Sequence, residues 1–522
     1  MEKLYKGDLM EFYKREIGFS KPRNFSRGIS ASEEMVARIL EFVVGCGVVA
    51  IILELIQNGL CKRCTMIAMV KRLDLYGKLT GHEGCVNTID FNATGDVLVS
   101  GSDDRRVILW DWATSTSKFS YPSGHMDNIF QTKFMPFTDD RKIITASADG
   151  QLARTLYSVD TLFLPAMVRL GLVLENGRVE TKKVGKHQGR VHKLAVEPGS
   201  PYILYSCGED GFVQHYDLRS NSSSKLFRCS SFTENNKQSG SIRLNGIVID
   251  PRNPNYFAVG GSDEYARVYD IRMYQLDART SADRPIDTFC PHHLIKTHDV
   301  HITALAYSNT SELLVSYNDE LIYLFQKNMG LGPVPLLLQG EDLNKLEKPQ
   351  VYSGHRNSQT VKGVSFFGPT DEYVLTGSDC GHIFIWKKKD AKLVRVMVGD
   401  RHIVNQLKPH PCIPVLATCG IEKTIKLWAP TSKDVTPLPP DVQEIMEANR
   451  RGREDHSRVT LTPDMIMHVL RLHRRQALAY IERRENLGYV DSDDDDDDGG
   501  GGAYVLGFSD GEEGENSECS IS

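Results

Sequence analysis

The sequence lacks the short motifs by which the commoner catalytic sites are recognised. It contains no glycine-rich phosphate loop opening a helix, no HExxH, no GxSxG and no pair of carboxylates with catalytic spacing that a blade turn does not already explain. The sequence therefore names no catalytic residue. We expect a protein that is not an enzyme, takes no small-molecule substrate and needs no cofactor.

A framework of paired cysteines is also lacking. The 11 cysteines are scattered, and the first 27 residues are charged throughout, unlike a secretory signal. These features favour a reducing compartment, and we expect a nuclear and cytoplasmic protein. Cys61 and Cys64 form a lone CxxC without the second pair or histidines that a zinc site needs, so we expect no metal.

Long hydrophobic runs are scarce. The run Phe42 to Leu53 has twelve uncharged residues between Glu41 and Glu54, too few to span a bilayer, although a membrane helix is the alternative interpretation. The dipeptide Met-Val stands on both sides of this segment, as Met35-Val36 and as Met69-Val70, as if one continuous stretch of sequence had been interrupted there. We therefore hypothesise that 39–70 is an insertion outside the working design of the protein, and intron-derived sequence is one source of such an insertion.

What the sequence does have is a repeated unit. In residues 81–112 a Gly-His pair precedes a β-rich run, a turn that ends at Asp104, and a strand that ends in Trp-Asp-Trp. The acid of the turn precedes an aromatic residue by six positions in five units: Asp104 and Trp110, Asp210 and Tyr216, Asp263 and Tyr269, Asp319 and Phe325, Glu422 and Trp428. A sixth unit has Asp379 one residue earlier, before Cys380, and ends at Trp386; the seventh is degenerate, with Thr155 six residues after Asp149.

This spacing is typical of WD repeats and predicts an all-β protein, a seven-bladed WD-repeat β-propeller with flanking helical and disordered segments. The turn carboxylate and the Gly-His imidazole are expected to hydrogen-bond beneath the aromatic residue, which makes them structural rather than catalytic. The blade residues are His82, Asp104, Trp110, His125, Asp210, Tyr216, Asp263, Tyr269, His355, Trp386 and Trp428.

The predicted propeller occupies 71–431. Residues 72–79 alternate like a half-buried strand and should complete the last blade by pairing near Lys426 and Trp428. A second interruption, near 152–167, lengthens blade two, and Val168 to Leu170 would resume its strand.

The predicted flanks are a leader (1–38), a linker and basic amphipathic helix (432–487) and an acidic disordered tail (488–522). The leader carries a short amphipathic helix with Leu9, Met10, Phe12, Tyr13 and Ile17 at helical spacing, which is typical of a groove-binding peptide but also of an inert leader. The tail has twelve acidic residues and no Lys or Arg. Because the whole chain has a net charge of -6, the residues before the tail carry a net positive charge. The nine arginines between Arg450 and Arg484 lie in the predicted basic helix and the linker before it. We interpret them as a solvated helix face, and we expect no direct binding of nucleic acid.

The blades differ just beyond the aromatic residue. Blade three ends Tyr-Asp217-Leu-Arg219 and blade four ends Tyr-Asp270-Ile-Arg272, whereas the other blades lack this DxR box. An Asp two residues before an Arg can orient its guanidinium, so two neighbouring boxes predict a docking patch for another protein. The alternative is that each box is only a salt bridge at the end of a blade.

The chain resembles the WD-repeat substrate receptors of cullin-4 RING ubiquitin ligases, and within them the family of cullin-4-associated factor eight (WD-repeat protein 42A). Besides the paired DxR boxes, the resemblance covers all the blades, roughly 71–431. It includes GCVNTIDFN (84–92), SGSDDRRVILWDW (100–112), FAVGGSDEYARVYDIR (257–272), GHRNSQTVKGVSFFGP (354–369) and SDCGHIFIW (378–386). The two interruptions depart from the family.

The resemblance implies a substrate receptor that engages the damage-specific DNA-binding adaptor of the cullin-4 ligase. Asp217, Arg219, Asp270 and Arg272 would dock the adaptor, the leader helix would enter its groove, and an unidentified target protein would be presented for ubiquitination. The alternative is a scaffold outside any ligase, such as a chromatin or signalling platform.

Overall fold

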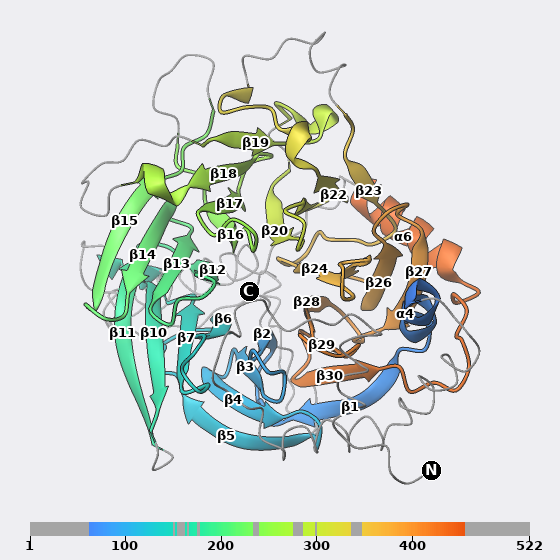
Figure 1. Ribbon diagram of the computed structural model, residues 1–522, viewed down its shortest axis with the longest axis horizontal. Helices are drawn as coiled ribbons and strands as arrows, with labels where there is room; N and C mark the ends of the chain where they lie inside the picture. The colour runs from blue at the N-terminus through green and yellow to red at the C-terminus, as the bar shows by residue number, and fades with distance from the viewer. Residues whose placement is uncertain are drawn as a thin grey trace, which may run out of the picture. The chain divides into compact units, whose positions relative to one another are not determined.

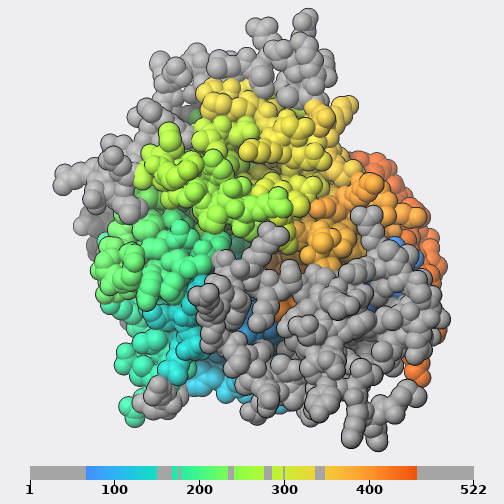
Figure 2. Space-filling model, in the orientation of Figure 1, coloured from blue at the N-terminus to red at the C-terminus, as the bar shows by residue number. Residues whose placement is uncertain are grey.

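In a computed structural model of the protein, the described residues form seven four-stranded antiparallel sheets, which are arranged as blades around a central axis (Figure 1). The structure describes residues 62–149, 152–153, 162–163, 166–174, 178–232, 240–274, 285–297, 300–335 and 347–454. The predicted seven-bladed propeller is confirmed. In the space-filling view the blades follow one another in chain order around the ring (Figure 2).

Within each blade the strands are ordered from the centre of the ring outward. Blade one contains β2 (Val86–Phe91), β3 (Leu98–Ser102), β4 (Arg106–Asp111) and β5 (Thr116–Pro122). Blade two contains β6 (Ile129–Phe134), β7 (Lys142–Ser147), β10 (Ala166–Val173) and β11 (Val179–His187). Blade three contains β12 (Val191–Val196), β13 (Ile203–Gly208), β14 (Phe212–Asp217) and β15 (Ser222–Arg228). Blade four contains β16 (Leu244–Ile249), β17 (Tyr256–Gly261), β18 (Ala266–Asp270) and β19 (Asp287–Phe289).

The remaining blades follow the same order. Blade five contains β20 (Ile302–Tyr307), β21 (Leu313–Tyr317), β22 (Ile322–Phe325) and β23 (Gln350–Tyr352), and blade six contains β24 (Val364–Phe367), β25 (Tyr373–Gly377), β26 (His382–Lys387) and β27 (Leu393–Val398). Blade seven contains β28 (Val404–Pro409), β29 (Leu416–Gly420), β30 (Thr424–Ala429) and β1 (Asp74–Thr80). Among the described connections lie three short 3-10 helices, η2 (Ile271–Met273), η3 (His292–Leu294) and η4 (Lys327–Met329).

The ring is closed by the strand that precedes the first repeat. β1 pairs antiparallel with β30, with Lys78 opposite Lys426 and Leu75 opposite Trp428, as the alternating pattern predicted. Closure leaves blade seven with its outermost strand supplied by the beginning of the ring, so neither end of the propeller presents an unpaired blade.

The interruption in blade two is bridged within the sheet. β10 resumes the third-strand position and pairs with β7, with Leu170 opposite Ile144. Between β7 and β10 the chain forms a separate two-stranded ribbon of β8 (Leu152–Ala153) and β9 (Leu162–Phe163).

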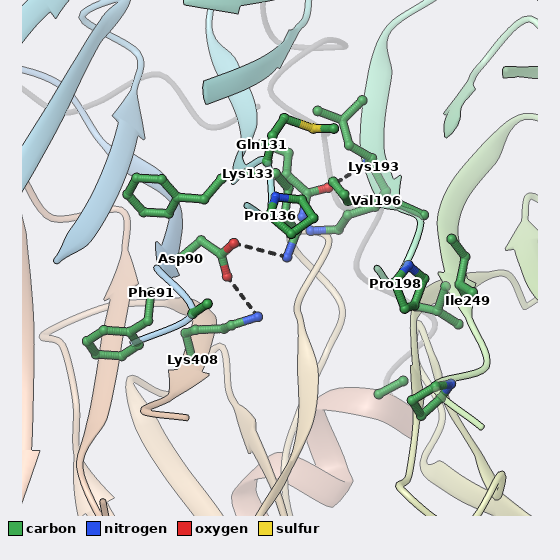
Figure 3. A pocket seen from close by; sticks show the side chains of 18 of the residues that line it. Asp90, Phe91, Gln131, Lys133, Pro136, Lys193, Val196, Pro198, Ile249 and Lys408 are labelled. Carbon is green, nitrogen blue, oxygen red and sulfur yellow. Dashed lines mark hydrogen bonds and ion pairs between the residues drawn. The ribbon is translucent and has the colours of Figure 1, made fainter. Parts of the chain in front are cut away.

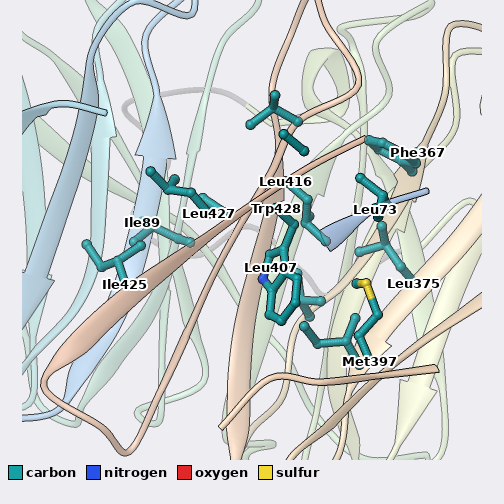
Figure 4. Packing of buried hydrophobic residues seen from close by; sticks show 14 of the residues in the cluster. Leu73, Ile89, Phe367, Leu375, Met397, Leu407, Leu416, Ile425, Leu427 and Trp428 are labelled. Atoms are coloured by element: carbon teal, nitrogen blue, oxygen red, sulfur yellow. The ribbon is translucent and has the colours of Figure 1, made fainter. Parts of the chain in front are cut away.

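The largest core cluster lies between blades six, seven and one. Leu407, Leu416, Leu427 and Trp428 of blade seven pack there with Leu73, as Figure 4 shows. The middle strands are apolar on both faces because a neighbouring blade covers each side; all five residues of β3 are buried, for example. Gly420 at the end of β29 has no room for a side chain, since an added Cβ would lie 1.9 Å from the carbonyl oxygen of Ile403.

The last residues of the predicted insertion 39–70 pack against the ring. α4 (Lys62–Lys71) covers part of this segment, and Met66, Met69 and Val70 are buried in the same core cluster. The rest of the segment, including the uncharged run, lies outside the described residues. No helix in the described part of the chain is long and apolar enough to cross a membrane.

The predicted linker contains a helix that the sequence analysis missed. α6 (Val442–Glu454) begins two residues after Pro440 and lies against blade six, where Val442 is buried beside Trp386 and Phe384. The predicted basic helix and acidic tail, together with the leader residues Leu9, Met10, Phe12, Tyr13 and Ile17, lie outside the described residues.

The expected bonds between the imidazole and the turn carboxylate occur in three blades. In blade one, Trp110 donates to Ser100 Oγ at 2.8 Å, Ser100 lies 2.7 Å from His82 Nε2, and His82 Nδ1 lies 2.8 Å from Asp104. Blade three repeats the arrangement, with Tyr216 in place of the tryptophan. Blade two keeps a His125–Asp149 pair at 3.3 Å although its aromatic position is degenerate.

Blades four and six depart from this expectation. Asp263 accepts from Arg267 at 2.6 Å, because blade four lacks the Gly-His pair and a buried guanidinium fills its role. In blade six, His355 is buried but neither ring nitrogen has a hydrogen-bond partner, since Asp379 pairs with Lys362 instead. Trp386 donates to the Ser353 carbonyl at 3.1 Å.

Candidate functional site

The first DxR box lies at the C-terminal end of β14 in blade three. β14 ends at Asp217, and Asp217 Oδ1 accepts from the backbone N–H of Arg219 at 2.9 Å, which turns the chain sharply after the strand. The guanidinium folds back on the same carboxylate, with Nε 3.0 Å from Oδ1 and Nη2 2.8 Å from Oδ2. The Arg219 side chain nevertheless stays 62% exposed.

The second box repeats this geometry at the end of β18 in blade four. Asp270 Oδ1 accepts from the backbone N–H of Arg272 at 3.0 Å and caps η2. Arg272 Nε and Nη2 lie 2.9 Å and 2.6 Å from the two carboxylate oxygens, and the side chain is 60% exposed. Both predicted arginines therefore face solvent in the same bidentate pose.

Each guanidinium also lies near a tyrosine ring that the sequence analysis missed. The centre of the Arg219 guanidinium is 5.4 Å from the ring of Tyr202, and that of Arg272 is 5.8 Å from the ring of Tyr256. Strand register explains the match, since Tyr256 lies opposite Asp270 and Tyr202 immediately precedes Ile203, which lies opposite Asp217. An aromatic residue at the start of the second strand in both blades was the available signal.

The two carboxylates are ionised, and each is hydrogen-bonded to the arginine of its own box. Hydrogen bonds from Arg219 lower the pKa of Asp217 to about 2, and those from Arg272 lower the pKa of Asp270 below its ordinary value. A carboxylate that accepts both Nε–H and one Nη–H leaves the remaining guanidinium donors free for a partner. Each box thus holds one pre-oriented set of outward-facing donors.

The two boxes lie on blades three and four, which are neighbours in the ring (Figure 1) and share a core. Phe227 of β15 stacks on Tyr269 of β18 with ring centroids 4.3 Å apart, so the two blade ends are fixed relative to each other. Exposed apolar side chains accompany the arginines: Tyr202 is 37% and Met273 63% exposed. Apolar surface beside well-oriented arginines is the composition of protein-binding patches.

The other blade ends are built differently. In blade one Asp111 is buried, and Trp112 donates to the Gly95 carbonyl at 2.6 Å, with Ala113 where the arginine would be. In blade six Lys388 bonds Glu312 at 2.8 Å, which ties that end to blade five. The arrangement of an exposed arginine clamped by its own Asp is found in blades three and four.

Within the described residues, no group of three or more His, Cys, Asp or Glu side chains is placed to hold a metal ion. The CxxC that the sequence analysis considered falls outside this part of the chain, because Cys61 and the side chain of Cys64 are not described.

Comparisons with known proteins agree with the fold. The family of the WD domain, G-beta repeat, matches residues 73–111 and 346–387. Human WD and tetratricopeptide repeats protein 1 is 31% identical, over 73% of this chain and 89% of the relative. Protein ALTERED SEED GERMINATION 2 of Arabidopsis thaliana is 32% identical, over 51% of this chain and 37% of the relative. Mouse DDB1- and CUL4-associated factor 6 is 33% identical, over 49% of this chain and 28% of the relative.

The chain thus spans well under half of the Arabidopsis relative and of the mouse factor, but most of the human relative. Its match to the human relative extends beyond the two segments recognised as WD repeats. The chain belongs to the WD-repeat family that includes WD and tetratricopeptide repeats protein 1.

Proposed function

We propose that this protein is a substrate receptor of a cullin-4 RING ubiquitin ligase, and that blades three and four dock its damage-specific DNA-binding adaptor. The observation that carries the proposal is the pair of exposed arginines, Arg219 and Arg272, each clamped by an Asp on adjacent blades. A relative named DDB1- and CUL4-associated factor 6 supports the ligase context.

The physical advantage of the clamp is preorganisation. A free arginine side chain loses about 2 kcal/mol of rotamer entropy when a partner orders it. Here the Asp and the tyrosine ring already hold the guanidinium, so less of that cost falls on binding. The donors that remain suit carbonyl or carboxylate groups of the adaptor.

The propeller itself acts as a scaffold in this proposal. The blade ends at the DxR boxes face the adaptor, and loops on the opposite side of the ring present a target protein for ubiquitin transfer. The leader helix would add a second contact in the groove of the adaptor.

The decisive experiment is recovery of the adaptor with a double variant. In the full-length chain, Arg219→Ala combined with Arg272→Ala should reduce co-purified adaptor at least tenfold, because loss of a central arginine in an interface costs about 2 kcal/mol or more. Arg105→Ala combined with Arg401→Ala is the matched control, since both are exposed arginines outside the boxes.

The control variant should recover as much adaptor as the wild type, and all three proteins should melt at the same temperature. Undiminished recovery with the DxR double variant would refute docking through the boxes. Wild-type protein that brings down neither adaptor nor cullin would refute the ligase role and favour the scaffold alternative.

A further inference from the structure

A large cavity opens at the centre of the ring, and no part of the proposed docking mechanism uses it. Its volume is about 970 Å³, and the innermost strand of each of the seven blades contributes to its lining. Loops between first and second strands, including Gly199 and Pro251, form its rim. A cavity of this size accommodates a small-molecule ligand.

Three lysine ammonium groups and one carboxylate meet inside this cavity (Figure 3). Asp90 of β2 pairs with Lys133 of β6 at 3.4 Å and with Lys408 of β28 at 2.8 Å. The side chain of Lys193 extends from β12 toward Lys133. Among the described residues no carboxylate pairs with Lys193, so the group carries two positive charges in excess.

The lysine side chains are only partly exposed, Lys133 at 23% and Lys408 at 35%, so water screens this excess of charge incompletely. Burial lowers the pKa of Lys133 to about 8 against the opposing effect of Asp90, and burial likewise lowers the pKa of Lys193. Mutual repulsion among the lysines adds to both shifts. Proteins compensate partly buried charges with partners, and among the described residues no carboxylate does so for the third lysine.

The rim has the opposite charge. Asp96, Asp139, Asp140 and Glu197 lie in the loops around the opening. A long polyanion such as a nucleic acid would keep further phosphates beside these carboxylates while bound, whereas a compact anion passes them once and then contacts only the lysines on the strands. The charge pattern therefore selects a ligand by size as well as by sign.

We propose that the central cavity binds a small phosphate-bearing molecule, whose phosphate group sits between Lys193 and Lys133. A phosphate monoester is close to a dianion at neutral pH, which matches the two excess charges. Lysine is a common phosphate ligand in proteins.

The test measures binding of inorganic phosphate to the full-length protein by calorimetry at constant ionic strength. Lys193→Met keeps the apolar stem, removes the unpaired charge and should weaken phosphate binding by about tenfold or more. Lys186→Met, an exposed lysine on the outer strand β11, is the control and should bind like the wild type.

A second variant predicts the opposite sign. Asp90→Asn removes the carboxylate that neutralises Lys133 and Lys408, so it should tighten phosphate binding severalfold if it folds. Sulfate should compete with phosphate, and a short single-stranded DNA should not. Absence of saturable phosphate binding by the wild type, equal binding by Lys193→Met, or tighter binding of the DNA at this site would each overturn the proposal.

Discussion

Blades one and six begin with the same Gly-His pair but hold it in different ways. In blade one, His82 is bonded on both ring nitrogens, to Asp104 and to Ser100. In blade six, His355 has no bond on either nitrogen, and its loop is held from outside the ring by α6, where Asn449 donates to the Gly354 carbonyl at 2.8 Å.

The difference shows that the Gly-His motif determines where the turn lies in the blade, but not which contacts stabilise it. Met446 of α6 packs against Gly354, and Arg453 bonds the His355 carbonyl. An internal hydrogen-bond network and an external helix thus stabilise equivalent turns. The comparison predicts that breaking the network destabilises blade one, whereas replacing the unbonded imidazole of blade six does not destabilise that blade at pH 7.

The largest effect is expected in blade one from Asp104→Ala. This carboxylate accepts from His82 and from the backbone N–H groups of Glu83 and Arg106, so its loss leaves three donors without their partner. The free energy of unfolding should fall by about 3 kcal/mol, measured by urea denaturation. Asp434→Ala, at an exposed position, should change nothing; a loss below about 1 kcal/mol with Asp104→Ala would show that the network does not stabilise the turn.

A pH-dependent effect is expected in blade six from His355→Phe. Burial, reinforced by Arg453 and Lys362, lowers the pKa of His355 to about 3, so the folded protein keeps the ring neutral while the unfolded chain protonates it near pH 6.5. Stability from this neutral form is complete above pH 6.5 and is lost as the pH falls toward 3. At pH 5 the variant should be about 2 kcal/mol more stable than the wild type.

At pH 7 the same variant should differ from the wild type by less than about 0.5 kcal/mol, because no hydrogen bond of the ring is lost. Thermal melts of both proteins from pH 7 to pH 5 give the comparison. A variant that is equally destabilised at both values would mean that the imidazole has a partner.

The smallest effect is expected from Asn449→Ala in α6. Loss of its bond to the Gly354 carbonyl should lower the free energy of unfolding by about 1 kcal/mol. Arg451→Ala is the matched control on the same helix, because it removes only an exposed pair with Glu447. If both variants have the same stability, α6 does not support the turn.

The regular part of the molecule was predictable from sequence. The six-residue offset between acid and aromatic residue located the blades, and alternation in 72–79 located the strand that closes the ring. Both signals are local or periodic. The pose of Arg219 on Asp217 was also predictable, because the two residues are only two positions apart.

Sequence reasoning missed what depends on residues brought together from afar. Tyr202 and Tyr256 look like ordinary strand residues until the register places them beside the arginines. Lys133, Lys193 and Lys408 lie in three separate blades, so only the closed ring gathers them. α6 was missed because the prolines before it suggested a linker.

His355 shows a third kind of limit. Its Gly-His pair is the same as that of His82, but its acid pairs with Lys362 instead of the imidazole. The shift of the acid by one position, to Asp379, was the available signal, and it marked a change of partner rather than a minor variation in spacing.

The pairing of β1 with β30 joins the first and the last strands of the propeller in the sequence. A ribosome delivers β1 first and β30 only after every intervening blade, so the nascent chain must wait with one blade incomplete. Contacts of such long sequence separation slow folding and leave strand edges open in the meantime. The first strand of the ring therefore stays unpaired until the last blade has been synthesised.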